Sequence, residues 1–185
     1  LVAVDRAGLV PGDGETHQGI YDTGYFSQIG IPVYSPCNYA ELEYWLEALV
    51  KTMRGPRVIR YARGEEKPAL AALGCTGKPY DMLCGADKAD TVLVSYGAET
   101  EEILAAAELL RHQGMAADCC KLVQVYPLPD GLCRQLSNYK TILFAEESVA
   151  TGGIGQQLCT ALQAAGWQGR FILRGVDNTH LLHAT

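Results

Sequence analysis

The residues best suited to chemistry lie near the start of the chain. Arg6, Asp13 and His17 bring a guanidinium, a carboxylate and an imidazole into a glycine-rich segment at residues 8–19. This segment follows the apolar run 1–4, which predicts a buried parallel strand. A loop at the carboxyl end of such a strand lies where open α/β sheets bind ligands. The three side chains are therefore candidates for a binding or catalytic site, with a polar surface turn as the alternative.

The elements that must position this loop alternate between strands and helices. Apolar residues at helical spacing predict an amphipathic helix at 39–53, and Gly114 is placed to end a second helix after residue 112. Strands are expected at 31–35, 57–62, 91–96, 117–125, 141–145 and 170–173, and helices at 22–28, 39–53, 100–112, after Pro129 and at 154–165. Such alternation predicts an α/β fold with a mainly parallel sheet.

A change in the sequence pattern divides the chain into two parts. Residues 67–89 lack periodicity and collect glycine, proline and lysine, which is typical of an interdomain linker. We therefore expect one domain at 1–66 and a second at 90–185. Because the sequence opens inside a strand, we expect residue 1 to be an artificial boundary or a proteolytic end, with a short native reading frame as the alternative.

Composition narrows the class of protein. The 185 residues are 48% hydrophobic and 19% charged, as in globular proteins, and carry a net charge of −6. Without a basic cluster, nucleic acid is not an expected partner. Because no apolar run reaches the length of a membrane span, we expect no membrane association, and the simplest location is the cytosol. The seven cysteines include no CxxC pair, which favours ordinary core residues over disulfides or zinc ligands.

The order of residues in the loop resembles a signature of a known enzyme family. It reads Asp-Arg-Ala-Gly-Leu-Val from residue 5, Asp-Gly at 13–14, Thr-His-Gln-Gly at 16–19 and Asp at 22. This resembles the pyrimidine-binding domain of deoxyxylulose-phosphate synthases, thiamine-diphosphate enzymes of the transketolase superfamily. Residues 60–64, Glu146-Glu147 and 152–155 also match family elements, with Ala62 replacing a usual proline. Residues 175–184 depart most, and no function is carried onto them.

The resemblance implies a fold and roles for four residues. The fold would be the C-terminal half of a pyrimidine-binding domain followed by a complete transketolase C-terminal α/β/α domain. His17 would contact the reacting oxygens as acid, base or hydrogen-bond donor, and Asp13 would bind a hydroxyl of the aldehyde substrate. Arg6 and Arg63 would clamp the phosphate of that substrate, although a solvated surface arginine is the alternative for Arg63.

The resemblance also implies an activity that this chain cannot perform alone. Such enzymes condense pyruvate with glyceraldehyde 3-phosphate, lose CO₂ and act as homodimers. Thiamine diphosphate and Mg²⁺ would bind to an N-terminal region that this chain lacks, so we expect no cofactor-binding or metal-binding residues here and an exposed sheet edge within residues 1–66. The alternatives are a separate C-terminal subunit of a split transketolase-like enzyme and a non-catalytic assembly module.

Three further patterns imitate binding sites. Gly12-Asp13-Gly14 with Asn38 imitates a diphosphate and Mg²⁺ motif, but it lies in mid-loop rather than directly after a strand, so we reject it. Glycines 152, 153 and 155 open a helix without the spacing of a phosphate loop, which favours a packing role. His180 and His183 have no evident partner and are expected to be surface side chains.

Overall fold

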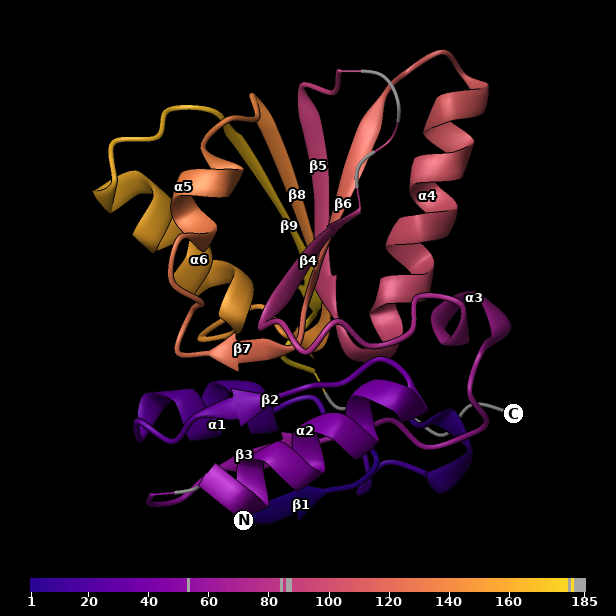
Figure 1. Cartoon of the computed structure of the whole chain (residues 1–185), viewed down its shortest axis with the longest axis vertical. Coiled ribbons are helices and arrows are strands. Elements are labelled where there is room, and N and C mark those ends of the chain that lie inside the picture. Colours follow the sequence, from indigo (N-terminus) through magenta and orange to yellow (C-terminus); the bar gives the residue numbers. More distant parts are fainter. Residues whose placement is uncertain (53, 84, 86–87, 180, 182–185) are drawn as a thin grey trace.

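Two sheets, stacked one above the other, form the body of the chain (Figure 1). The computed structural model describes residues 1–52, 54–83, 85, 88–179 and 181. The first sheet occupies the lower part of the view and the second sheet the upper part, with the chain start at the bottom. No helix in these ranges is both long and apolar enough to cross a membrane.

The first sheet has the strand order β1-β3-β2-β7. Three short parallel strands, β1 (Val2–Val4), β3 (Val58–Arg60) and β2 (Val33–Tyr34), are joined by antiparallel β7 (Gln124–Tyr126). The helices of this half are α1 (Asp22–Gln28) and α2 (Tyr39–Thr52). Helix α2 buries Leu49 against Tyr34 and Ile59, with Leu42 and Trp45 packed alongside. Strands β1 and β7 are the two edges of this sheet.

The second sheet has the order β4-β6-β5-β8-β9. Its strands are β4 (Tyr80–Leu83), β5 (Thr91–Tyr96), β6 (Ala117–Leu122), β8 (Thr141–Val149) and β9 (Arg170–Val176), all parallel to their neighbours except β4. Helix α4 (Thr100–His112) lies on one face, whereas α5 (Leu132–Leu136) and α6 (Ile154–Ala164) lie on the other (Figure 1). This arrangement confirms the expected α/β/α domain.

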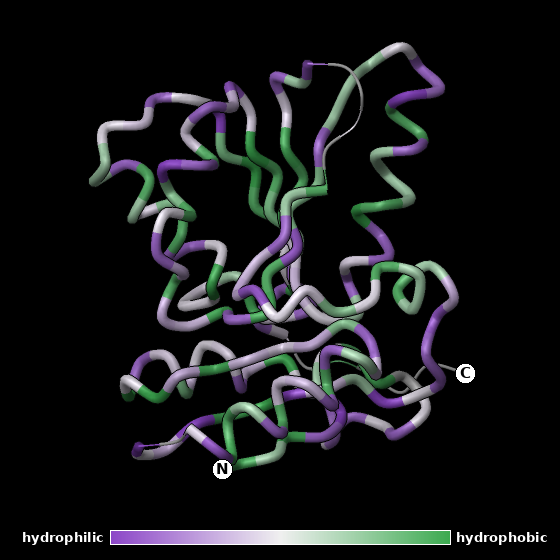
Figure 2. The backbone as a smooth tube through the Cα atoms, viewed as in Figure 1, coloured by the Kyte–Doolittle hydropathy of each residue, from purple (hydrophilic) through white to green (hydrophobic). Residues whose placement is uncertain are grey.

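Coverage of both faces explains the composition of the central strands. Val92, Val94, Ile142 and Phe144 are fully buried and pack with residues of α5 and α6. Leu93 and Cys119 point to the other face and pack with Ile103 of α4 and its neighbours. The central strands are therefore mostly apolar along their length, rather than alternating between apolar and polar residues. Figure 2 shows their hydrophobic colouring.

The strand expected at 117–125 is two strands in different sheets. β6 ends at Leu122, and β7 begins at Gln124 and pairs with β2 of the first sheet. At the break, the backbone N–H of Val123 donates to the Pro79 carbonyl, and the Val123 carbonyl accepts from Ser35 N–H. Both groups of Val123 are thus satisfied while the chain crosses between sheets. The second half of the chain consequently completes the first sheet.

The segment at 67–89, expected as a linker, carries secondary structure. It contains α3 (Pro68–Ala71) and β4, which pairs with β6 at the edge of the second sheet. The strand lacks a recognisable apolar run because Asp81, although buried, is charged. The domain boundaries at 66 and 90 stay a prediction.

A buried ionic group joins the two halves. Lys121 on β6 contacts the Glu41 carboxylate of α2 and lies 3.0 Å from Oδ2 of Asp81 on β4. The side chains of Lys121 and Glu41 are each only 1% exposed. Because an unpaired charge at this depth would be costly, the three groups require each other and fix how α2 sits on the second sheet.

Candidate functional site

The loop after β1 is closed at its neck by glycines. Gly8 and Gly19 exchange two backbone hydrogen bonds of 2.9 Å, so residues 9–18 project as a compact unit. Gly8 has a φ of +86°, and a Cβ at this position would overlap Glu147. Gly19 lies against the backbone of Arg6 and Ala7. Glycine suits both places, because Gly8 has a positive φ and no room beside Glu147, and a Cβ at Gly19 would overlap the backbone of Arg6.

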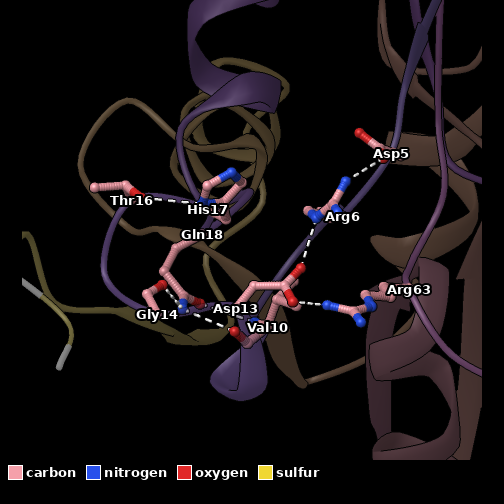
Figure 3. A network of polar contacts seen from close by, with 9 residues as sticks. All are labelled: Asp5, Arg6, Val10, Asp13, Gly14, Thr16, His17, Gln18 and Arg63. Atoms are coloured by element: carbon pink, nitrogen blue, oxygen red, sulfur yellow. Dashed lines mark hydrogen bonds and ion pairs between the residues drawn. The ribbon is translucent and has the colours of Figure 1, made fainter. Parts of the chain in front are cut away.

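The structure brings three of the four expected site residues together. Arg6 follows β1, Asp13 ends the short helix η1 (Pro11–Asp13), and Arg63 follows β3. Oδ2 of Asp13 accepts a hydrogen bond from Nε of Arg6 at 2.5 Å, and Oδ1 of Asp13 pairs with the guanidinium of Arg63 (Figure 3). The loop places Arg6 at a φ of +57°, an uncommon conformation for a residue with a Cβ. Such conformations persist only where the surroundings hold them.

His17 lies apart from this cluster. Its Nδ1 is 3.0 Å from the hydroxyl of Thr16, and the side chain is exposed. In Figure 3 the imidazole stands across the loop from Arg6 and Arg63. Between them, Gln18 ties the loop together through the backbone of Val10 and the carbonyl of Gly14. The expected roles of all four residues stay predictions.

A buried arginine contacts the neck of the loop. Arg60, the last residue of β3, is 3% exposed, and its Nε donates to Asp22 at 2.7 Å. The same guanidinium donates to the Gly19 carbonyl at 3.1 Å and lies 5.4 Å from the ring centroid of Tyr96. Arg60 and Arg63 therefore have different partners, Asp22 and Gly19 for Arg60 and Asp13 for Arg63. Arg60 holds one end of the loop neck.

Glu147, near the end of β8, packs against the neck at Gly8. Burial raises the pKa of Glu147, and the charge of Arg60 partly opposes this shift. Glu99, in the short helix η2 (Gly97–Glu99), has its pKa raised to about 7 by burial and by the charges of Glu147 and Glu102. The second domain thus contacts the site loop through Glu147, a carboxyl group that ionises less readily than usual.

The glycine stretch at the start of α6 encloses a carboxylate of the protein itself. Glu146 accepts hydrogen bonds from the N–H groups of Ile154 and Gly155 at 3.2 and 3.0 Å, and from the Tyr96 hydroxyl at 2.7 Å. A Cβ at Gly153 would lie 2.6 Å from Oε1 of Glu146. The glycines therefore allow Glu146 to occupy the end of the helix where an anion would bind, which supports their packing role.

The Gly12-Asp13-Gly14 segment, whose mid-loop position argues against a metal and diphosphate motif, has cationic partners. Both carboxylate oxygens of Asp13 face guanidinium groups. Within the described ranges no group of three His, Cys, Asp or Glu residues is placed to hold a metal ion. His180 and His183 lie outside the described residues. The donor set at Asp13 suits an anion-binding arginine pair rather than a cation.

Two cavities flank Arg63. One, of about 250 Å³, is lined by Asp5, Arg6, Tyr61, Ala62 and Arg63. The other, of about 160 Å³, lies between the residues before α2, the segment 61–67 and the start of α4, with Ala98 and Glu101 on its wall. Arg63 thus stands where the two halves of the chain meet. Its guanidinium can be reached from solvent, because the side chain is 53% exposed.

Reasoning from the sequence missed Glu147 and assigned no role to Arg60. Glu147 was noted only as part of a matching Glu-Glu pair, and a glutamate near a strand end gives no sign of its partner. Arg60 carried a detectable signal, because an arginine within an apolar strand must find an anion. That signal identifies a buried ion pair without showing that it supports the loop.

Comparison with known sequences places the second domain in a family. The family described as transketolase, C-terminal domain, matches residues 83–184. The whole chain is 30% identical to a 1-deoxy-D-xylulose-5-phosphate synthase of Rhodococcus jostii, covering 29% of that protein. It is 32% identical over 98% of its length to the enzyme of the same name from Gloeobacter violaceus, again covering 29%. The chain spans less than a third of the curated relatives it matches.

Solved structures show the same fold. A split-gene transketolase, solved as an inactive β4 tetramer, aligns over 96% of this chain and 57% of its own, with a TM-score of 0.75 and 21% identity. A transketolase variant from Pichia stipitis aligns over 98% of this chain and 26% of its own, with a TM-score of 0.67 and 20% identity. At these identities the likeness establishes the fold alone.

Proposed function

Because the chain belongs to the transketolase C-terminal domain family, we propose that it forms the aldehyde-binding part of a 1-deoxy-D-xylulose-5-phosphate synthase. The whole enzyme would condense pyruvate with glyceraldehyde 3-phosphate, release CO₂ and form 1-deoxy-D-xylulose 5-phosphate. The names of the relatives and their similarity along the whole chain support this assignment. We further propose that the whole enzyme is a cytosolic homodimer.

The observation that carries the proposal is the convergence of two guanidinium groups. Arg6 and Arg63 come from the carboxyl ends of adjacent parallel strands and meet at one carboxylate. A forked guanidinium matches the oxygens of a phosphate in charge and in geometry, so a pair of them suits the phosphate of the aldehyde substrate. A surface arginine without such a role would not need a neighbour on another strand.

We assign the other two site residues by the same reasoning. Asp13 would bind a hydroxyl group of the aldehyde, and His17 would exchange a proton with the reacting oxygens, which an imidazole can do near neutral pH. His17 lies across the loop from the arginines, at an exposed position. Its partner would therefore be the substrate or the part of the enzyme that holds the cofactor.

The described residues do not suit the cofactor. Thiamine diphosphate, when bound, supplies the chemistry that joins the carbon atoms of the two substrates. Its diphosphate and Mg²⁺ need acidic ligands and free N–H groups, whereas Asp13 is paired with two arginines and the start of α6 is occupied by Glu146. We propose that the cofactor binds to an N-terminal region outside this chain, and that the chain alone is inactive.

A second arrangement, a separate C-terminal subunit, also has support. The aligned split-gene transketolase is described as an inactive β4 tetramer. In that case the N-terminal region would be a different polypeptide that associates with this one. The DNA directly upstream of the codon for Leu1 distinguishes the two arrangements, because an uninterrupted reading frame would encode the N-terminal region. If neither arrangement forms 1-deoxy-D-xylulose 5-phosphate, the chain would instead be a non-catalytic assembly module.

The experiment that tests the proposed function uses the whole enzyme and Arg63. Arg63→Ala should lower kcat/KM for glyceraldehyde 3-phosphate by about 10- to 150-fold, because hydrogen bonds to charged groups contribute roughly 1.5 to 3 kcal/mol. The pyruvate requirement should barely change, since pyruvate carries no phosphate. Arg63→Lys keeps the charge but loses the fork, so it should recover only part of the loss.

Unphosphorylated glyceraldehyde provides the control. A contact with phosphate cannot affect a substrate that has none, so Arg63→Ala should not lower the use of glyceraldehyde. Equal losses with both aldehydes would mean that Arg63 supports the fold, and the phosphate assignment would be wrong. A wild-type enzyme that forms no product from pyruvate and glyceraldehyde 3-phosphate would overturn the proposed activity itself.

A further inference from the structure

One carboxylate joins the two arginines that we assign to the substrate phosphate. Each oxygen of Asp13 faces a different guanidinium, Oδ2 that of Arg6 and Oδ1 that of Arg63. The side chain of Asp13 is 14% exposed, whereas those of Arg6 and Arg63 are 37% and 53% exposed. Both arginines also line the cavity of about 250 Å³. The guanidiniums can therefore be reached from outside while the carboxylate lies between them.

A carboxylate and a phosphate compete for these donors. Both are anions whose oxygens accept from a guanidinium fork, but a phosphate monoester has three acceptor oxygens and a charge near −2 at neutral pH. Arg6, Arg63, Asp5 and Asp13 together carry two positive and two negative charges. Because this group is already neutral, a phosphate that enters it is favoured only if an anion leaves.

We propose that Asp13 competes with the substrate phosphate for Arg6 and Arg63, and that a phosphate monoester binds by displacing it from these arginines. This inference rests on the proposed function, which assigns the phosphate to these arginines. The displaced carboxylate becomes available for the hydroxyl of the same substrate. Asp13 thereby determines specificity, because an aldehyde without a phosphate cannot compete for the arginines and leaves Asp13 bound to them.

The surroundings of Asp13 allow such a displacement. Gly12 and Gly14 flank it, and a Cβ added at either would meet no atom of the described residues within 4 Å. The loop itself is held elsewhere, at the Gly8–Gly19 neck and by Gln18. The segment that carries Asp13 thus has room to shift while the ends of the loop stay in place.

Calorimetric titration of the chain with glycerol 3-phosphate tests the proposal without requiring activity or cofactor. Asp13→Asn should bind glycerol 3-phosphate about 5- to 30-fold more tightly than the wild type, since it removes the competing anion from a partly exposed site. Asp5→Asn is the matched control, because it removes an equal charge that also pairs with Arg6 but does not bridge to Arg63. The affinity of Asp5→Asn for glycerol 3-phosphate should differ from that of the wild type by less than about threefold. Adding Arg63→Ala to Asp13→Asn should abolish the gain.

The outcomes separate this inference from the proposed function. If the wild type binds glycerol 3-phosphate and Asp13→Asn binds it no more tightly, the displacement is wrong, although the phosphate site stands. If neither chain binds it, the phosphate assignment of the arginines fails, and the displacement fails with it.

A measurement on the wild type guards against a poorly folded variant. The carbon-13 signal of the Asp13 carboxyl group should move on addition of glycerol 3-phosphate and stay in place with glycerol. A signal that does not move while phosphate binds would overturn the proposal.

Discussion

Glu147, near the end of β8 in the second sheet, packs against Gly8 at the neck of the loop that carries the candidate site. The contact joins two halves of the chain that are far apart in sequence. Arg60 holds the opposite side of the loop neck through the Gly19 carbonyl. The second domain therefore does more than complete the fold, because it fixes the base of the loop from which Arg6 and Asp13 extend.

Removal of the Glu147 carboxylate should loosen that loop. We expect Glu147→Ala to increase the hydrogen-exchange rate of the Leu9 amide, since it removes the side chain that packs against the neck of the loop. Amide exchange followed by NMR measures this directly. Glu102→Ala, which removes a neighbouring acidic group on α4, should leave the Leu9 amide unchanged. Equal acceleration in both variants would mean that global stability, not the local contact, was altered.

Stability should depend on pH through Glu99. Burial and the charges of Glu147 and Glu102 raise the pKa of Glu99 from 4.5 in the unfolded chain to about 7 in the fold. Between these values the folded state holds a proton that the unfolded state has lost, so stability falls as pH rises through this window. Glu99→Gln, which resembles the protonated form, should remove this part of the fall.

Urea unfolding at pH 5 and at pH 8 measures the effect of Glu99→Gln. Because Glu99 is only about half buried, solvent screening limits the expected gain to about 1 kcal/mol at pH 8, with a smaller gain at pH 5. Glu101→Gln, on the same helix end, provides the comparison. A gain at pH 8 no larger than that at pH 5 would show that Glu99 ionises normally in the folded chain.

The fold was largely predictable because its second half follows regular patterns. Apolar runs marked the central strands, and the acidic start and basic end of residues 100–112 marked α4. The crossing at Val123 was not predictable. Residues 117–125 contain no glycine or proline to mark a break, and nothing local shows that β7 leaves its sheet to pair with β2. Such partners depend on tertiary packing, which periodicity does not record.

The candidate site was predictable in its members but not in its arrangement. Arg6, Asp13 and His17 share one loop, and Arg63 was found through its motif. Asp13 pairs with both arginines, whereas His17 lies apart from them. Both positions depend on the loop path, which the Gly8–Gly19 neck sets. The sequence contains those glycines, but their mutual hydrogen bonds appear only in three dimensions.

The buried group of Lys121, Glu41 and Asp81 should be essential to the junction of the two halves. Lys121→Met leaves two carboxylates buried without their cation, so we expect it to destabilise the fold by about 3 to 5 kcal/mol in urea unfolding. Combining it with Glu41→Gln and Asp81→Asn should restore most of the loss, because none of the three side chains in this group then carries a charge. Lys140→Met is the matched control, since Lys140 pairs with Asp90 at an exposed site, and it should leave stability nearly unchanged. A similar loss in both single variants would contradict this account.

His17 tests whether the exposed side of the loop takes part in the reaction. In the whole enzyme, His17→Ala should reduce turnover by about 10²- to 10⁴-fold with both substrates saturating, which is the usual contribution of general acid–base catalysis. Affinity for thiamine diphosphate should stay nearly constant, because we place the cofactor outside this chain. Steady-state kinetics and a cofactor titration measure the two quantities separately.

Thr16 provides the matched control for His17. Its hydroxyl lies 3.0 Å from Nδ1 of the imidazole, and both side chains are exposed. If the two residues only shape a surface turn, Thr16→Ala and His17→Ala should both leave turnover nearly normal. If the imidazole transfers a proton, Thr16→Ala should lower turnover only slightly, since it removes a neighbour that orients the ring. His17→Ala should lower turnover strongly, because it removes the reacting group. Near-normal turnover in His17→Ala would return this residue to the surface-turn interpretation and would require another source for the proton.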